Sequence, residues 1–368
     1  MVIITLIAKV LPEGAIIMGR RIASKSRVRT ARLLPLCLLT TLCGQGVAPA
    51  IAQETLPWQT SATAPADKSS AAGAAGVQAA RTPAPDRRPA KQVFGRIAAP
   101  ADLAPRAIGF YAKGCLAGAR ALPVDGPAWQ VMRLSRNRNW GHPAMVTYVE
   151  RLAREVKAKD GWPGLLVGDM AQPRGGPMLT GHASHQIGLD ADIWFTPMPS
   201  SVLSRDEREQ LAATNMLASK LAVDAKVWTD THVKLIRRAA SYPEVERVLV
   251  NPAIKKALCD GAGKDREFLK KVRPIWGHDH HFHVRLSCPK GSESCRPQEP
   301  TKGEDGCGKE LDDWFKLLTA PPKPAEKPEP SKPPVTVEGL PAECRLVLTA
   351  AEPTGRTPAQ KAAHGTNK

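Results

Sequence analysis

Residues 281–286, His-Phe-His-Val-Arg-Leu, alternate polar and apolar side chains with the period of two that is typical of a half-buried β-strand. Successive side chains of a strand point to opposite faces, so His281, His283 and Arg285 share one face and the apolar residues share the other. The apolar face must pack on a core. The histidine face is therefore free to line a cleft.

Residues 189–195, Leu-Asp-Ala-Asp-Ile-Trp-Phe, show the same alternation. Asp190, Asp192 and Trp194 would lie on one face of this second strand, and apolar residues on the other. The sequence thus predicts two strands that each have one face able to bind a ligand.

A metal site follows if the polar faces of these strands meet. His185 lies just before the second strand, and Gly188 between them permits a turn that folds His185 back beside Asp192. With His283 they make two nitrogen ligands and one carboxylate, the set of a catalytic zinc with an open water position. Copper, nickel or iron could also take such nitrogens. Asp190 is expected to hold a ligand imidazole in its tautomer.

The distribution of histidines supports a site over the alternative of separate hydrogen-bonded histidines. The chain has nine histidines, and six of them fall within residues 182–185 and 278–283. Scattered structural histidines would not gather in two short windows that both adjoin strand patterns.

The remaining periodicity predicts an α+β fold on a small sheet, because helices and short strands follow one another without strict βαβ alternation. Helices are expected at 143–158, within 206–223, from residue 231, at 252–259 and at 264–272. Strands are expected at 164–170, at 189–195, from residue 247 and from residue 281.

Both ends of the chain are unlike folded protein. Residues 1–52 have the basic, apolar and small-residue order of a secretory signal peptide, with Met18 as an alternative start. Residues 53–95 are rich in Ala, Pro and Ser and predict a disordered arm, and residues 320–368 predict a tail rich in Pro and Lys. The folded domain is expected at 96–319.

The charge of the chain fits either an anionic partner or a basic surface that only keeps the protein soluble. The net charge of +17 falls to +11 when residues 1–52, with seven basic residues and one acidic residue, are removed. An exported protein this basic is more suited to an anionic cell-wall polymer than to nucleic acid, so we expect no nucleic-acid partner. The apolar run is too short to span a bilayer, and no membrane anchor is expected after cleavage.

Six cysteines remain after the predicted cleavage, which indicates three disulfides in an oxidising compartment. They are Cys115, Cys259, Cys288, Cys295, Cys307 and Cys344. Spacing alone leaves their 15 pairings open.

The two histidine segments together resemble a known family. The stretches Gly181 to Phe195 and Lys271 to Pro289 are similar to the penicillin-insensitive murein endopeptidases, a group related to lysostaphin and the D-alanyl-D-alanine metallopeptidases. The resemblance runs from about Cys115 to Phe315. It implies a small central antiparallel sheet flanked by helices.

The resemblance also implies roles for individual residues. The zinc ligands fall on His185, Asp192 and His283, and His182 matches a further histidine near the metal. His281 matches the proton-transfer residue, and His278 another residue that lines the site. The implied disulfides are Cys115–Cys344, Cys259–Cys307 and Cys288–Cys295.

The implied activity is hydrolysis of the D-alanyl to meso-diaminopimelyl cross-link of peptidoglycan in the periplasm. Alternatives are a D,D-carboxypeptidase, an L,D-endopeptidase or a catalytically silent wall-binding module. Some family members hold a second metal at a dimer interface, but no histidine lies between Thr196 and Trp228 here, so one zinc per chain is expected. A homodimer is left open. A serine enzyme with an S-x-x-K nucleophile at Ser287 is a rival, although its companion motifs are missing.

Overall fold

The computed structural model describes residues 84–321 and 333–354, all within one compact unit that spans residues 78–368. The predicted signal peptide and the first part of the predicted arm lie outside the described residues. Within the described ranges, no helix is both long and apolar enough to cross a membrane.

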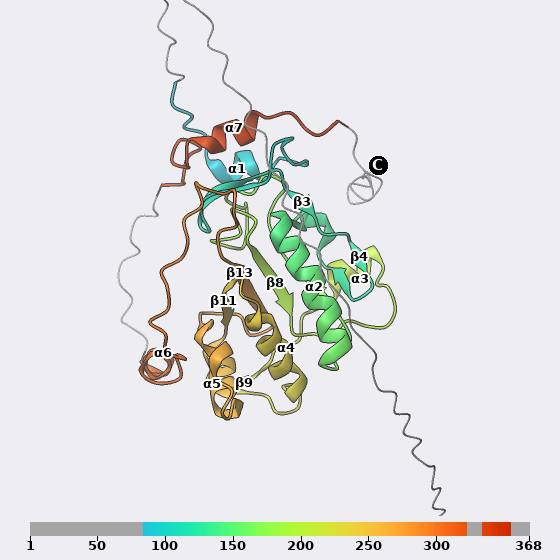
Figure 1. The fold of residues 1–368 in the computed structure, drawn as a ribbon, viewed down its shortest axis with the longest axis vertical. Coiled ribbons are helices and arrows are strands. Elements are labelled where there is room, and N and C mark those ends of the chain that lie inside the picture. Colours follow the sequence, from blue (N-terminus) through green and yellow to red (C-terminus); the bar gives the residue numbers. More distant parts are fainter. Residues whose placement is uncertain (1–83, 322–332, 355–368) are drawn as a thin grey trace, which may run out of the picture. The chain divides into compact units, whose positions relative to one another are not determined.

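A seven-stranded mixed sheet forms the centre of the fold, in the order β12-β11-β13-β8-β7-β5-β4 (Figure 1). Its strands are β4 (Asp125–Gly126), β5 (Trp129–Val131), β7 (Leu165–Val167), β8 (Asp190–Trp194), β11 (Val245–Val250), β12 (Val272–Pro274) and β13 (His281–Leu286). Within the four central strands β11-β13-β8-β7, each strand is antiparallel to the next. At the two ends of this group, β12 is parallel to β11 and β5 is parallel to β7.

The expectation of an antiparallel sheet is therefore wrong at two pairings, β11 with β12 and β5 with β7, whereas β4 is antiparallel to β5. Parallel neighbours need a crossover connection. Helix α2 (Pro143–Lys159) lies in the connection from β5 to β7, and α5 (Pro252–Gly261) lies in the connection from β11 to β12. The sequence predicts both helices, and the parallel direction of β12 to β11 and of β7 to β5 follows from their position in the crossovers.

One face of the sheet carries the core. Ala191 and Ile193 of β8 and Phe282 and Val284 of β13 are fully buried in one cluster with the apolar residues of α2 and α4 (Asp230–Ser241). Pro143 begins α2, where its missing N–H costs nothing, and the His142 ring accepts a hydrogen bond from the Ala144 N–H. The opposite face of β8 and β13 is left for polar side chains.

Most predicted elements form near their expected places, but the helix expected within 206–223 is short. Helix α3 (Arg205–Gln210) ends where the Arg133 guanidinium donates to the carbonyls of Arg208 and Leu211. The chain then forms the hairpin of β9 (Leu217–Ser219) and β10 (Ala222–Val223). The helix expected at 264–272 is a 3₁₀ turn, η2 (Glu267–Lys270).

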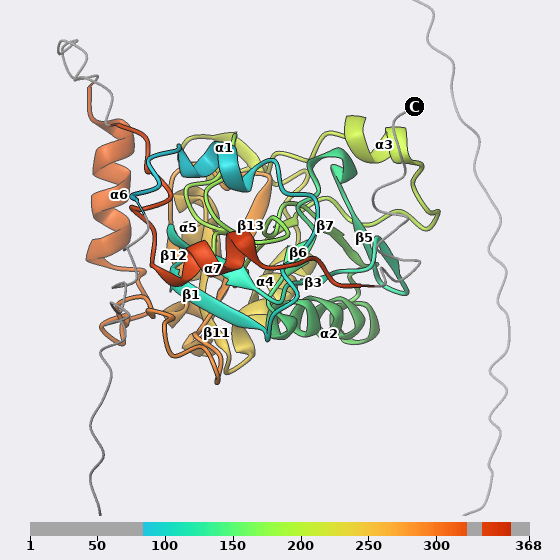
Figure 2. The ribbon, with the colours of Figure 1, turned by 90° about the horizontal axis from the view of Figure 1, so that it is seen from above.

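A second apolar cluster joins the two ends of the described chain (Figure 2). It contains the hairpin of β1 (Arg106–Phe110) and β2 (Lys113–Ala117), with α1 (Ala90–Phe94) and α7 (Glu343–Thr349). The predicted arm therefore does not extend to residue 95, because Ala90 and Phe94 are buried here. The remaining elements are β3 (Arg120–Ala121), η1 (Leu134–Arg136), β6 (Trp140–Gly141) and α6 (Lys309–Thr319).

All three disulfides implied by the resemblance are formed. Cys115–Cys344 ties α7 to β2, Cys259–Cys307 ties α5 to the segment before α6, and Cys288–Cys295 closes the loop after β13. The first of these has a sequence separation of 229 and fixes the C-terminal segment to the domain.

Candidate metal centre

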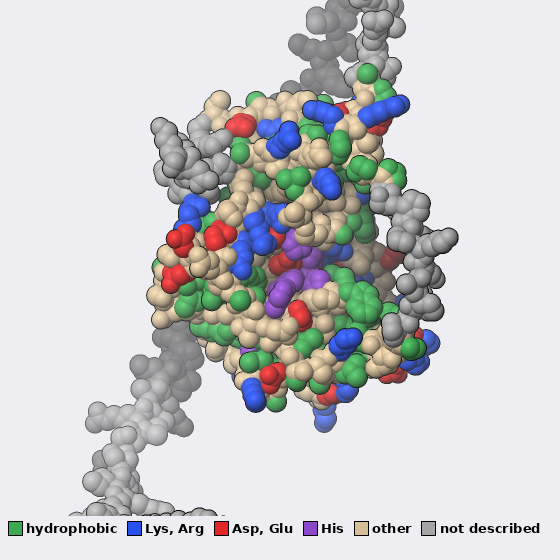
Figure 3. All heavy atoms as spheres, turned by 180° about the vertical axis from the view of Figure 1, so that it is seen from behind, with side chains coloured by type: hydrophobic (Ala, Val, Ile, Leu, Met, Phe, Trp, Pro, Cys, Tyr) green, Lys and Arg blue, Asp and Glu red, His purple; other side chains and the backbone are tan. Residues whose placement is uncertain are grey.

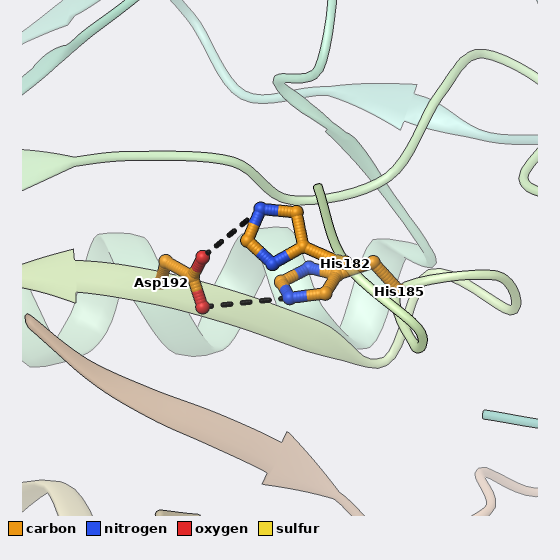
Figure 4. A group of neighbouring side chains, drawn as sticks. All are labelled: His182, His185 and Asp192. Carbon is orange, nitrogen blue, oxygen red and sulfur yellow. Dashed lines mark ion pairs between the residues drawn. The ribbon is translucent and has the colours of Figure 1, made fainter. Parts of the chain in front are cut away.

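Strands β8 and β13 bring the two histidine segments together on the polar face of the sheet. Their antiparallel register places His283 directly opposite Asp192, and Arg285 directly opposite Asp190. His182 and His185 come from the loop before β8 and point toward Asp192 (Figure 4). The sequence predicts the polar face of each strand, and the structure adds that the two strands are neighbours in this register.

One oxygen of Asp192 is the point on which the imidazoles converge. Its Oδ1 lies 3.2 Å from His283 Nδ1, 3.4 Å from His185 Nε2 and 3.6 Å from His281 Nε2. The other oxygen lies 3.4 Å from His182 Nε2. Among the described residues, His182, His185 and Asp192 form a group whose ligand atoms all lie within 4.8 Å of one another, and this group includes His182 but not the expected ligand His283.

The polar atoms at this point have a chemistry that fits a metal ion. Among the described residues, His185 Nδ1 and Nε2, Asp192 Oδ1 and His281 Nε2 are buried without a hydrogen-bond partner. A buried polar atom without a partner usually costs roughly 1–3 kcal/mol. An unpartnered carboxylate oxygen with two unpartnered imidazole nitrogens, His185 Nε2 and His281 Nε2, beside it fits a site that a cation would complete, and imidazoles with a carboxylate suit a divalent transition metal.

Asp190 orients the His283 imidazole by contacting the ring nitrogen that points away from Asp192. Its fully buried carboxylate accepts hydrogen bonds from His283 Nε2 at 2.8 Å, from Arg285 Nε at 2.8 Å and from the His185 backbone N–H at 2.9 Å. The first contact leaves His283 Nδ1 directed at Asp192. Although burial opposes the charge of His283, Asp190 and Asp192 raise the pKa of His283 to about 9.

The loop before β8 needs two left-handed backbone positions to deliver His185. Gly188 has a φ of 72°, and a Cβ there would lie 2.5 Å from Leu116 Cδ2 and 2.7 Å from the backbone nitrogen of His142. His185 itself has a φ of 66°, which is unusual for a residue other than glycine. Its backbone N–H is held by Asp190, so the loop and the strand fix each other.

Asp169 is a site residue whose role sequence reasoning missed. It follows β7, and its carboxylate accepts from His182 Nε2 at 3.0 Å and from the guanidinium groups of Arg136 at 3.0 Å and Arg138 at 2.8 Å. Burial works against ionisation, but His182 and the arginines lower the pKa of Asp169 to about 2. Asp169 lies two residues after β7, within the segment 164–170 that the sequence predicts to be a strand, so no local pattern marked it as a site residue.

His281 and His278 lie at the open side of the cluster. Their rings are 4.7 Å apart, and the His278 ring is 5.9 Å from that of His283. His278 Nδ1 is 2.8 Å from the Trp276 carbonyl oxygen. Burial lowers the pKa of His281 to about 4, so this imidazole is neutral near pH 7 and can accept a proton.

The rival serine motif has no suitable geometry. Ser287 directly follows β13, and residues 287–290 form no helix that could present a nucleophile and a lysine on one face. Cys288 within the motif is held in the disulfide with Cys295. The histidine cluster is therefore the better candidate for an active site.

Comparison with known proteins identifies the family of this chain. Residues 107–349 match the model of the family described as penicillin-insensitive murein endopeptidase. A relative of that name from Haemophilus influenzae is 47% identical over 245 residues, which cover 66% of this chain and 82% of the relative.

Two enterobacterial relatives carry the same name. One from Klebsiella pneumoniae is 43% identical over 66% of this chain and 86% of its own length, and one from Pectobacterium atrosepticum is 42% identical over 70% of this chain and 89% of its own length. The matched residues 107–349 of this chain include the whole histidine cluster. This chain belongs to the penicillin-insensitive murein endopeptidase family.

Proposed function

We propose that this protein is a zinc-dependent murein endopeptidase that hydrolyses the D-alanyl to meso-diaminopimelyl cross-links of peptidoglycan in the periplasm. The observation that carries the proposal is the group of buried atoms without hydrogen-bond partners around Asp192. Relatives named penicillin-insensitive murein endopeptidase support the reaction.

His185, Asp192 and His283 would hold the ion, and His182 lies close enough to approach it. Zinc is the best match, because its catalytic sites combine three such ligands with one open position. When bound, zinc would lower the pKa of a water molecule to about 7 and polarise the scissile carbonyl.

The remaining histidines supply the proton transfer. In the hydrolysis, a water oxygen forms a bond to the carbonyl carbon, the C–N bond breaks, and a proton passes to the leaving amine. His281 has an Nε2 that is buried without a hydrogen-bond partner and lies 3.6 Å from Asp192 Oδ1, and this position suits the transfer of that proton. The His278 ring lies 4.7 Å from that of His281 and lines a cleft together with His182 and His283.

The setting of the protein is part of the proposal. Export through residues 1–52, three disulfides and a basic mature chain suit an enzyme that acts on anionic peptidoglycan in an oxidising compartment. The related fold would be that of the lysostaphin and D-alanyl-D-alanine metallopeptidases. A homodimer is compatible with this function but not required by it.

The test is to incubate the purified protein with cross-linked muropeptide dimers and to follow monomer release. We expect release that persists with penicillin, stops with a chelator, returns with added zinc and is lost in His283→Ala. Monomer release that survives both the chelator and the substitution would contradict the zinc mechanism. Free D-alanine without monomer would instead identify a carboxypeptidase, and binding without any cleavage would identify a wall-binding module.

A further inference from the structure

A cleft of about 1070 Å³ runs from the histidine cluster across the polar face of β13, β11 and β12. His182, His278 and His283 line one end of it. In the space-filling view the histidines lie together in a hollow with Lys and Arg side chains directly beside them (Figure 3). The cleft residues beyond the histidines are therefore placed to contact the parts of a bound substrate that lie next to the reacting bond.

Three arginines lie on this face of the sheet in adjacent register positions. Arg247 of β11 pairs with Arg285 of β13, Leu249 pairs with His283, and Arg273 of β12 pairs with Leu249. With strands ~4.8 Å apart and two residues spanning ~6.8 Å, the Cα atoms of Arg247 and His283 are about 8 Å apart. All three arginines line the cleft.

The three guanidinium groups differ in how their charge is balanced. Arg285 is paired with Asp190 at 2.8 Å, and Arg273 has Glu310 at 3.7 Å. Arg247 donates only to the backbone carbonyls of Glu246 and Glu299, and no ion pair within the described ranges includes it.

Arg247 is nevertheless buried, with 7% of its surface exposed. Burial lowers its pKa, and the charges of Arg273 and Arg285 lower it further, against an opposing effect of Glu246. The Glu246 carboxylate is itself occupied by the Tyr111 hydroxyl at 2.6 Å and the Gln298 N–H at 3.1 Å. Since an arginine stays charged in a protein, Arg247 is a buried cation that an anion in the cleft would stabilise.

We propose that Arg247, assisted by Arg273, binds a free carboxylate of the peptide substrate on the leaving-amine side of the scissile amide. The inference rests on the proposed function, whose diaminopimelyl residue keeps a carboxylate on the carbon that bears the leaving amine. Arginine suits this role because its planar fork can bind a carboxylate through two parallel hydrogen bonds. The site would select cross-links with that carboxylate free over cross-links with it amidated.

The competing explanation is that Arg247 only fastens the loop that contains Glu299. Arg174 provides a matched control, because it is also buried, at 4% exposed, and also donates to backbone carbonyls, those of Ala99 and Val347. Arg174 does not line the cleft. A purely structural arginine should lower stability without changing the choice between the two substrates.

The experiment compares two muropeptide dimers that differ only in whether this carboxylate is free or amidated. Values of kcat/KM are measured with the zinc-loaded protein, with Arg247→Met and Arg247→Lys, and with Arg174→Met as the control. Hydrogen bonds to a charged group contribute roughly 1.5–3 kcal/mol, so the wild type should prefer the free acid about 10- to 100-fold, mainly through KM. Arg247→Met should abolish the preference, Arg247→Lys should keep part of it, and Arg174→Met should retain it.

Equal cleavage of the two dimers by the wild type would overturn the inference while leaving the proposed function intact. A full preference in a folded Arg247→Met protein would overturn it as well. Cleavage of neither dimer by the zinc-loaded wild type would overturn the proposed function and this inference with it. Melting temperatures establish that each variant is folded, and the wild-type comparison stands even if a variant is not.

Discussion

The substitution Asp190→Asn removes the group that orients His283 while changing the side-chain size very little. The buried carboxylate now accepts from His283 Nε2, Arg285 Nε and the His185 N–H, all at 2.8–2.9 Å. Asparagine offers one acceptor oxygen and an amide group that can only donate. At least one of these three donors would therefore lose its partner, and Arg285 would lose its counter-charge.

The magnitudes follow from these contacts. Losing one partner of a buried ion pair costs about 3–5 kcal/mol, because the other charge stays buried. Loss of a carboxylate behind a ligand histidine typically weakens metal binding about 10- to 100-fold. We therefore expect Asp190→Asn to lower both the melting temperature and the affinity for zinc.

Zinc affinity can be measured by competition with a chromophoric chelator, and stability by calorimetry of the same samples. The matched control is Asp169→Asn, which removes the carboxylate that contacts His182 Nε2 and leaves the hydrogen bond between Asp190 and His283 in place. Its zinc affinity should fall less than that of Asp190→Asn. A folded Asp190→Asn protein that binds zinc with wild-type affinity would refute the role assigned to Asp190.

Three further predictions concern the scaffold. Gly188→Val should lower the yield of folded protein and the activity, because a Cβ at φ 72° would lie 2.5 Å from Leu116 Cδ2; a variant with normal melting temperature and activity would contradict this. Replacing Cys115 and Cys344 together by serine should cost about 2–5 kcal/mol in chemical unfolding, because their bond closes a long loop, and an unchanged unfolding midpoint would show that the bond is dispensable. Burial lowers the pKa of Lys255 from 10.5 to about 7. Between these two values the unfolded state binds one more proton than the folded state, so the free energy of unfolding should rise with pH. The rise up to pH 9 should be on the order of 2 kcal/mol. Lys255→Met should lose that rise, and an identical pH dependence in the variant would contradict the cause.

The part of the site that the sequence predicts is the part set by strand periodicity. Alternation in β8 and β13 determines which face carries Asp190, Asp192 and His283, and a slip of one residue would move the whole set into the core. Gly188 marks the turn because only glycine takes a positive φ without strain.

The parts that the sequence does not predict depend on contacts between distant segments. Asp169 meets His182 because β7 lies beside β8, and the carbonyls at the end of α3 accept hydrogen bonds from the distant Arg133. Helix α1 forms within a segment of low apolar content because it packs against the cluster that contains Cys115. None of these contacts has a local pattern.

The most direct measurement is a crystallographic anomalous difference map at the zinc absorption edge for the zinc-loaded protein. We predict one peak about 2.0–2.2 Å from His185 Nε2, from Asp192 Oδ1 and from His283 Nδ1. In the present structure His185 Nε2 and His283 Nδ1 both face Asp192 Oδ1. The absence of a peak there, or a peak whose ligands do not include Asp192 and His283, would contradict the zinc site and the mechanism built on it.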